Sequence, residues 1–242
     1  MELLGACALV TGGARRVGRA ISLGLAGAGC DLVLHYGSAE TEAAATAADA
    51  EALGARVSLV GADLADPRSP ERLLAAAGDL APVRVLVNSA AVFPDDDLAG
   101  ITAEQWDRTL AVNLRAPVLL TRAFAAALPE GSEGAVVNIT DWRTARPYRE
   151  HFSYTVAKGG LGAFTRAAAE ALAPRIRVNA VALGAILPPP GRGSDYLKAL
   201  AQEIPAGQPG GTDPVVAAVL FLLRNPFVTG EILRVDGGAH LR

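Results

Sequence analysis

Residues 6–18 have the sequence ACALVTGGARRVG, an apolar run that leads directly into a glycine-rich turn. A buried strand, a tight turn and the start of a helix together form an anion site, because glycine lets the backbone approach a phosphate and free N–H groups point at it. Many turns between a strand and a helix need glycine only for a positive φ. This turn follows the first strand of a repeating β-α series, so we predict that it binds a nucleotide. The predicted contacts in the turn are Gly12, Arg15, Arg16, Val17 and Gly18.

The rest of the chain repeats this alternation of short apolar runs and long alanine-rich runs. The short runs are apolar almost throughout, which is typical of strands that are covered on both faces. Repeated strand–helix–strand units predict an α/β fold, a doubly wound parallel sheet of seven strands with helices on both faces, and residues 1–242 are expected to form a single domain. The predicted strands are Ala6–Thr11, Asp31–Tyr36, Arg56–Gly61, Arg84–Asn88, Gly134–Thr140, Arg177–Leu183 and Glu231–Val235. The predicted helices are Val17–Ala28, Ala39–Leu53, Pro70–Ala77, Thr102–Leu128, Tyr154–Ala173 and Pro214–Leu223.

One segment departs from this alternation. Residues 188–211 are rich in proline and glycine, and only Tyr196–Glu203 has some helical character. Long connections of this kind are usually functional, so we expect a substrate loop or lid after the sixth strand.

The composition excludes several classes of protein. The chain is 51% apolar and 19% charged, with a formal net charge of −3, which argues against intrinsic disorder and against nucleic-acid binding. It contains no stretch of roughly 18 uncharged apolar residues, so no membrane span is expected. The N-terminus shows no targeting signal, and Cys7 and Cys30 fit buried reduced thiols, so we expect a cytoplasmic protein. No metal site is expected.

The end of the second predicted strand bears on the identity of the nucleotide. Folds that bind NAD usually place an acid there, which holds the ribose 2′-hydroxyl. This chain has His35, Tyr36, Gly37 and Ser38 instead, close to the two arginines of the turn. These groups suit a 2′-phosphate, so we favour NADP(H) over NAD(H), with Ser38 as a hydroxyl contact. His35 and Tyr36 lie at the same site, but His35 is assigned no chemical role.

Further candidates follow the third and fourth strands, at the edge where such sheets bind ligands. They are Asp63 and Leu64 after the third strand, and Asn88 and Ala90 after the fourth. Asp63 suits an acceptor for an adenine amine, and it equally suits a cap for a helix that begins near Asp66. Both roles stay open.

Tyr154 and Lys158 lie four residues apart, on one face of a predicted helix. An ammonium group beside a phenol favours the phenolate, and this predicts that Lys158 lowers the pKa of Tyr154. A phenol with a lowered pKa suits proton transfer near neutral pH. We therefore predict that this pair is catalytic.

The motifs described so far, together with several others, follow one another in order along nearly the whole chain. They are Thr11–Gly18, Asp63-Leu64, Asn88, Asn113, Tyr154 with Lys158, Arg177-Val178-Asn179, Gly184 and Val235-Asp236-Gly237-Gly238. With these motifs the chain resembles the short-chain dehydrogenase/reductase family. The resemblance implies a Rossmann-type fold, with Tyr154 as the general acid and Lys158 as its partner and a contact to the cofactor ribose. It also implies that Asn113 holds a relay water and that the nicotinamide lies near Asn179–Ile186, with Gly184 and Ile186 as cofactor contacts. The helices Thr102–Leu128 and Tyr154–Ala173 are expected to pair with their copies in a homotetramer.

Three departures from the usual family pattern are informative. The family usually has a serine thirteen residues before the tyrosine, and this chain has Asp141. An ionised carboxylate has no donor for a substrate carbonyl, but it suits a nitrogen heterocycle whose N–H groups need acceptors. Arg16 replaces the usual middle glycine, and Phe93 is placed to stack on a planar ring. Together these residues resemble the pteridine reductase branch, which includes dihydromonapterin reductases.

The leading hypothesis is an NADPH-dependent reductase of a pterin-like ring, of the dihydropteridine or dihydrofolate type. Tyr154, Lys158, Asp141 and Asn113 are its predicted catalytic residues, and Phe93, Asp141 and Tyr154 its predicted substrate contacts. The alternatives are a carbonyl reductase of a ketone or 3-oxoacyl substrate, with Asp141 drifted from serine, and a sensor that binds NADP(H) without turnover. Phe93 equally suits packing of its loop, Trp142 suits a pocket wall or a surface position, and His151 is expected to be exposed.

Overall fold

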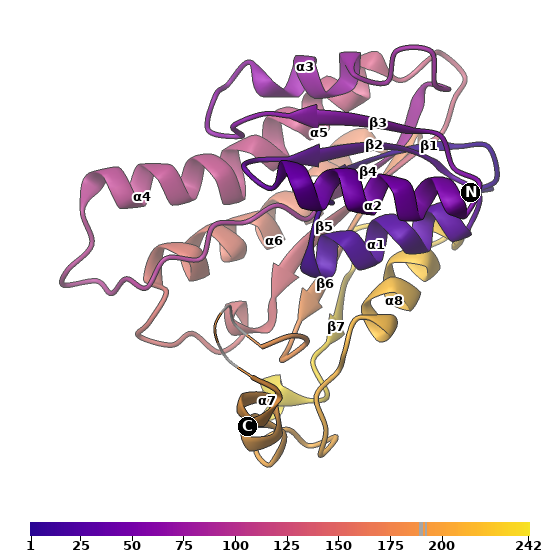
Figure 1. The fold of residues 1–242 in the computed structure, drawn as a ribbon. Coiled ribbons are helices and arrows are strands. Elements are labelled where there is room, and N and C mark those ends of the chain that lie inside the picture. Colours follow the sequence, from indigo (N-terminus) through magenta and orange to yellow (C-terminus); the bar gives the residue numbers. More distant parts are fainter. Residues whose placement is uncertain (189–190, 192) are drawn as a thin grey trace.

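Seven parallel strands form one sheet in the part of the chain that the structure, a computed structural model, describes, namely residues 1–188, 191 and 193–242 (Figure 1). Their order is β3-β2-β1-β4-β5-β6-β7, so the chain reverses its direction of winding between β1 and β4. The predicted doubly wound parallel sheet is confirmed. The strands are β1 (Cys7–Thr11), β2 (Asp31–Tyr36), β3 (Val57–Gly61), β4 (Val83–Asn88), β5 (Gly134–Asp141), β6 (Ile176–Leu183) and β7 (Ile232–Val235).

Helices cover both faces of the sheet, as the uniformly apolar strands predict (Figure 1). One face carries α1 (Arg16–Gly27), α2 (Glu40–Ala52) and α8 (Asp213–Arg224), which pack side by side. The other face carries α3 (Ser69–Ala75), α4 (Ala103–Leu110), α5 (Ala116–Ala127) and α6 (Phe152–Leu172). The predicted bounds differ from these by a few residues at most helix ends, where fraying makes the boundary a matter of definition.

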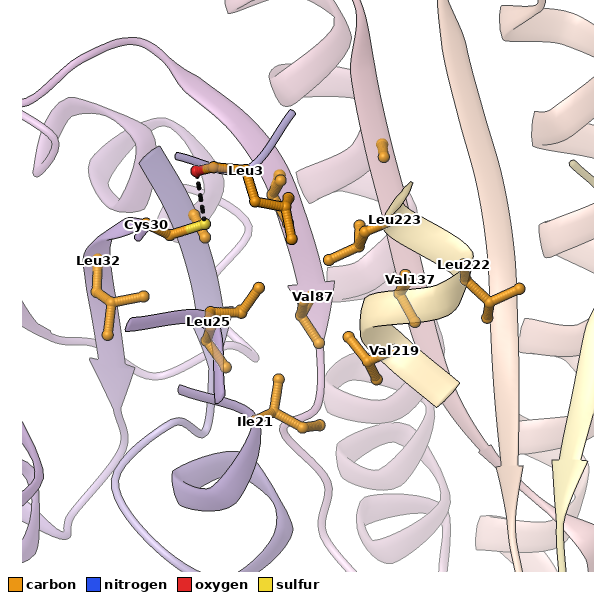
Figure 2. Packing of buried hydrophobic residues seen from close by; sticks show 14 of the residues in the cluster. Leu3, Ile21, Leu25, Cys30, Leu32, Val87, Val137, Val219, Leu222 and Leu223 are labelled. Carbon is orange, nitrogen blue, oxygen red and sulfur yellow. Dashed lines mark hydrogen bonds between the residues drawn. The ribbon is translucent and has the colours of Figure 1, made fainter. Parts of the chain in front are cut away.

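Two apolar layers hold the sheet between the helices. On one side Ile21 and Leu25 of α1 belong to one buried cluster with Val219 and Leu223 of α8 and with apolar residues of β1, β4 and β5 (Figure 2). On the other side α5 and α6 cover the same strands. Fully burying one such aliphatic side chain stabilises the fold by roughly 1.5–3 kcal/mol, so these layers fix the strand ends that carry the site.

Both cysteines belong to these layers as free thiols, as predicted. Cys30 donates a hydrogen bond to the carbonyl oxygen of Leu3 at 3.3 Å (Figure 2). Burial raises the pKa of Cys7 to about 12 and that of Cys30 to about 11. Neither thiol forms a reactive thiolate near neutral pH.

The predicted helix Thr102–Leu128 is confirmed as one continuous helix over Ala103–Ala127, but the prediction did not foresee a change of helix type within it. Thr102 and Gln105 form a reciprocal capping box at the start of α4, but residues 111–115 form a π-helical segment, η1 (Ala111–Arg115), before α5 begins. Apolar periodicity does not reveal a single wide turn inside a helix. The wide turn contains Asn113.

The stretch Ala103–Ala127 also meets length and composition criteria for a membrane-spanning helix, with a mean hydropathy of 1.2 in its most apolar window. Half of that window is buried inside the protein. A helix that packs against a sheet has the same features, so this stretch is weak evidence for a membrane span.

The predicted substrate loop is described only in part, because residues 189, 190 and 192 lie outside the described residues. The helical character expected at Tyr196–Glu203 corresponds to α7 (Ser194–Ala201). This helix and the turns that follow it lie beyond the carboxyl end of β6 (Figure 1).

Candidate active site

A cavity of about 1710 Å³ lies at the carboxyl ends of the strands, around the position where β1 and β4 are neighbours. Sites for one small molecule usually measure roughly 300–1,000 Å³, so this cavity has room for a dinucleotide and a second ligand. All predicted site residues line it except Asn88 and Asn113. Residues of the partly described loop also reach it, among them Tyr196, Leu197, Leu200 and Glu203.

The turn after β1 requires glycine at two positions. Gly12 has a φ of +64°, and a Cβ atom there would lie 2.9 Å from the Cα atom of Ala90. A Cβ atom on Gly18 would lie 2.0 Å from the carbonyl oxygen of Gly12. The α1 N-terminus has no side-chain cap from Arg15 and no acid in its first turn. Its free N–H groups and the bare backbone of the turn therefore fit a phosphate group.

Arg16 adopts a left-handed conformation, with a φ of +55°. This backbone costs a residue with a side chain roughly 1–2 kcal/mol, a cost that glycine would not have. The Arg16 guanidinium donates to the carbonyl oxygen of Pro188 at 2.8 Å. The side chain thus links the glycine-rich turn after β1 to the start of the predicted substrate loop.

His35, in the neighbouring strand β2, supports the glycine-rich turn after β1. It is 2% exposed, and its Nδ1 atom accepts from the Gly12 N–H at 3.1 Å while its Nε2–H donates to the Ala62 carbonyl at 3.0 Å. This pair of bonds requires the neutral ring. Burial lowers the pKa of His35 below its usual value, which favours the same form.

We expect this neutral histidine to make stability depend on pH. Because the folded-state pKa is lowered, the unfolded chain takes up the proton first, and the stabilisation present above about pH 6.5 is lost as the pH falls below that value. Thermal unfolding between pH 7.5 and 5.5 should therefore show a larger fall in Tm for the wild type than for His35→Gln. Parallel curves for the two proteins would rule out this role.

Asp63 is held by an ion pair. Its carboxylate accepts from the Arg108 guanidinium at 2.7 Å and from the Ala65 N–H at 2.9 Å. The Arg108 hydrogen bond holds the pKa of Asp63 below its usual value. The next helix begins only at Ser69, so Asp63 is not its cap and that alternative was wrong. The carboxylate lines the cavity, and its contact with an adenine amine stays a prediction.

At the other end of the cavity, three of the four predicted catalytic side chains lie close together, those of Asp141, Tyr154 and Lys158. The Tyr154 hydroxyl donates to Oδ2 of Asp141 at 3.0 Å. The Lys158 ammonium donates to the Ile139 carbonyl at 2.7 Å and lies 5.6 Å from the centre of the Tyr154 ring. Tyr154 and Lys158 share a face of α6, and Asp141 is the last residue of β5.

The predicted effect of Lys158 on Tyr154 was wrong. Burial and the neighbouring Asp141 carboxylate raise the pKa of Tyr154 well above its usual value. The prediction considered only the charge of the lysine and neither the burial of the phenol nor its carboxylate partner. Burial lowers the pKa of Lys158 to about 8, so the ammonium is still the main form at neutral pH. The phenol therefore keeps its proton and is a donor.

Asp141 is 8% exposed and directs its carboxylate toward this phenol. Its other oxygen, Oδ1, accepts from the backbone N–H of Arg143 at 2.9 Å. A carboxylate oxygen has more than one acceptor position, so both oxygens can accept further donors from a ligand. Arg143 was not among the predicted site residues, because no motif or spacing in the sequence singles it out.

Phe93 lies beside this pair and is 45% exposed. The edge of the Tyr154 ring meets it at a centroid distance of 4.6 Å, and the His151 ring stacks on it at 3.7 Å. His151 is half-buried and hydrogen-bonded to the Pro94 carbonyl at 2.6 Å, so the expectation that it is exposed was wrong. Trp142 is also half-buried and lines the cavity, and it contacts Tyr148 edge to face.

Asn88 and Asn113 lie behind the cavity wall. The Asn113 amide accepts from the Val92 N–H at 2.9 Å and donates to the Val92 carbonyl at 2.8 Å. Asn88 donates to Oδ1 of Asn138 at 2.8 Å. The two bonds of Asn113 hold the segment after β4 that carries Phe93, and the Asn88 bond joins β4 to β5. The role of Asn113 in a proton relay stays a prediction.

Asp96 is a positioning residue that the sequence analysis missed. Its carboxylate accepts from the Ser153 N–H at 3.1 Å and from the Ser153 hydroxyl, and so it caps the N-terminus of α6 from a distant segment. The cap holds the turn that carries Tyr154. Its 57-residue separation from Ser153 leaves no local signal in the sequence.

Known proteins are similar to this chain both in sequence and in structure. Residues 12–240 match the family model described as Enoyl-(Acyl carrier protein) reductase. The chain is 32% identical to the 3-oxoacyl-[acyl-carrier-protein] reductase of Synechocystis, over 96% of this chain and 95% of that protein.

Two crystal structures are similar over nearly their whole length. FolM alternative dihydrofolate reductase 1 from Brucella canis, complexed with NADP, has a TM-score of 0.94 and 36% identity, covering 100% of this chain and 96% of that one. A short chain dehydrogenase from Burkholderia cenocepacia in complex with NADP has a TM-score of 0.90 and 33% identity, covering 99% of both chains.

Proposed function

This chain belongs to the short-chain dehydrogenase/reductase family, and we propose that it is an NADPH-dependent reductase of a pterin-like ring. The observation that carries the proposal is the hydrogen bond at 3.0 Å that the Asp141 carboxylate accepts from the Tyr154 hydroxyl. A similar structure from Brucella canis is a FolM alternative dihydrofolate reductase, which favours a ring of the dihydropteridine or dihydrofolate type.

The nucleotide end supports NADP(H) as the cofactor. The bare backbone at Gly12 and Gly18 and the uncapped start of α1 fit its pyrophosphate. We assign Arg15, Arg16 and Ser38 to the 2′-phosphate, since all three line the cavity and β2 ends without an acid. Two similar structures are complexes with NADP. When bound, NADPH supplies a hydride for a ring carbon.

The remaining steps belong to side chains of this chain. The phenol of Tyr154 holds its proton and passes it to the ring nitrogen next to the reduced carbon, so a C=N bond becomes CH–NH. The Asp141 carboxylate orients the phenol and accepts N–H groups of the ring. Phe93 offers an aromatic surface for the ring, and a proton from solvent restores the phenol.

A carbonyl reductase is the second candidate, because the Synechocystis relative is a 3-oxoacyl-[acyl-carrier-protein] reductase. Tyr154 and Lys158 suit that reaction equally. Asp141 does not, because an ionised carboxylate repels the alkoxide that forms on a carbonyl oxygen.

Oxidation of NADPH in the presence of dihydrobiopterin, dihydrofolate or an acetoacetyl ester distinguishes these candidates. We expect turnover of a dihydropterin with kcat/KM at least about tenfold above that of the ester, a difference of about 1.4 kcal/mol in transition-state binding. The reverse order of kcat/KM would favour the carbonyl reductase. Tight NADPH binding without turnover of any substrate would favour a sensor.

The assembly and the location of the protein are further proposals. We propose a homotetramer in which α4, α5 and α6 pair with their copies, and a cytoplasmic location. The first rests on the family resemblance and the second on the two buried free thiols, and light scattering at micromolar concentration tests the first.

A further inference from the structure

Arg143 faces the Asp141–Tyr154 pair, and the proposed function does not use it. It lies in the short 3₁₀ helix η2 (Trp142–Thr144), directly after β5. Its NH1 atom lies 3.5 Å from Oδ2 of Asp141, the same oxygen that accepts the Tyr154 hydroxyl. The guanidinium is therefore an ion-pair partner of the Asp141 carboxylate, the group that we propose binds the N–H groups of the substrate ring.

The same guanidinium also lies over two aromatic rings. Its central carbon is 5.5 Å from the centre of the Phe93 ring and 5.5 Å from the centre of the Tyr148 ring. His151 already covers one face of Phe93 at 3.7 Å. A flat ligand that contacts both Phe93 and Asp141 must therefore compete with Arg143 for this place.

A pterin presents the same kind of hydrogen-bond donors as the Arg143 guanidinium that it would replace. Its pyrimidine edge carries an amino group on a carbon between two ring nitrogens, which is a flat, guanidine-like arrangement of donors. Carboxylates bind such an edge as they bind arginine, through paired N–H donors. A simple ketone offers neither the donors nor the flat face.

We infer that Arg143 determines the substrate class by exchange: its guanidinium holds Asp141 and Phe93 until a ring with a guanidine-like edge takes over both contacts. The Arg143 side chain is 26% exposed at the cavity, so it has a path into solvent. This inference rests on the proposed function and narrows its substrates to flat rings with an amino group between two ring nitrogens.

Binding of 2,4-diaminopyrimidine tests the exchange without turnover. Calorimetry on the full chain should show that Arg143→Met binds this probe at least about fivefold more tightly than the wild type, because the internal competitor is gone. Arg143→Lys keeps the charge but not the flat group, and its affinity should lie between the two. Arg146→Met is the matched control: Arg146 lines the same cavity, and its removal should change the affinity less than twofold.

Guanidinium ion provides a second readout. At low millimolar concentration it should weaken probe binding to Arg143→Met, where it can take the vacated place, and not to the wild type, with sodium chloride at equal ionic strength as the reference. Unchanged or weaker probe binding in Arg143→Met would overturn the inference.

Kinetics separate this inference from the proposed function. With a dihydropterin, Arg143→Met should lower KM and leave kcat within about threefold. A wild type that reduces no pterin would refute the proposed function, but the probe comparison would still decide whether Arg143 exchanges. A fall in kcat with unchanged probe affinity would overturn the exchange and place Arg143 in the proton-transfer machinery.

Discussion

Replacing Asp141 by asparagine is expected to lower kcat/KM for a dihydropterin by about 100-fold, since a hydrogen bond to a charged group contributes about 1.5–3 kcal/mol. Asparagine has nearly the same shape but no charge, and its NH₂ group would face the N–H donors of the ring. It also removes the carboxylate that accepts the Tyr154 hydroxyl at 3.0 Å. Initial rates of NADPH oxidation measure the effect.

Two further variants control this prediction. Asp141→Ser supplies the hydroxyl donor that a carbonyl substrate needs, and it should raise kcat/KM for an acetoacetyl ester while it lowers that for the dihydropterin. Glu150→Gln removes another acid that lines the same cavity and that has no assigned role, and it should leave kcat for the dihydropterin nearly unchanged. Unchanged dihydropterin kinetics in both Asp141 variants would refute the role of the carboxylate.

Replacing Tyr154 by phenylalanine is expected to lower kcat by about 1,000-fold, within the 10²- to 10⁴-fold range of general acid catalysis. The change deletes the protonated phenol that burial and Asp141 maintain, and it keeps the ring that contacts Phe93. The affinity for NADPH, measured by fluorescence titration, should change less than about twofold, because a lost proton donor affects the transition state rather than ground-state binding.

Tyr148→Phe is the matched control, because Tyr148 lines the same cavity and we assign its hydroxyl no part in proton transfer. It should keep kcat within about threefold, which is less than 1 kcal/mol in the barrier. A Tyr154→Phe enzyme that retains more than a tenth of the wild-type kcat would show that another group donates the proton.

The fold could be predicted from the sequence because each strand is apolar over most of its length and each connection between strands contains a helix. The sequence also placed Gly12, Gly18, Asp141, Tyr154 and Lys158 at one site, since the carboxyl ends of parallel strands meet at one edge of a sheet. These features are local, or follow from the order of the strands alone.

The features that the sequence did not reveal depend on contacts between distant segments. Asp96 caps α6 from a separate segment, and His35 supports Gly12 from the neighbouring strand. The direction of the Tyr154 pKa shift depends on burial, which a spacing of four residues does not report. The wide turn at Asn113 and the position of Arg143 over Phe93 also follow from packing.

The central claim is that the Asp141 carboxylate binds the nitrogen-bearing edge of the substrate beside the Tyr154 phenol. A crystal structure of the protein with NADP and 2,4-diaminopteridine tests it most directly. We predict that a ring amino group and a ring nitrogen lie about 2.7–3.0 Å from the two carboxylate oxygens, with the Arg143 guanidinium displaced. A ligand seated against the phenol with its amino groups away from Asp141, and with the Asp141–Arg143 pair intact, would contradict the account.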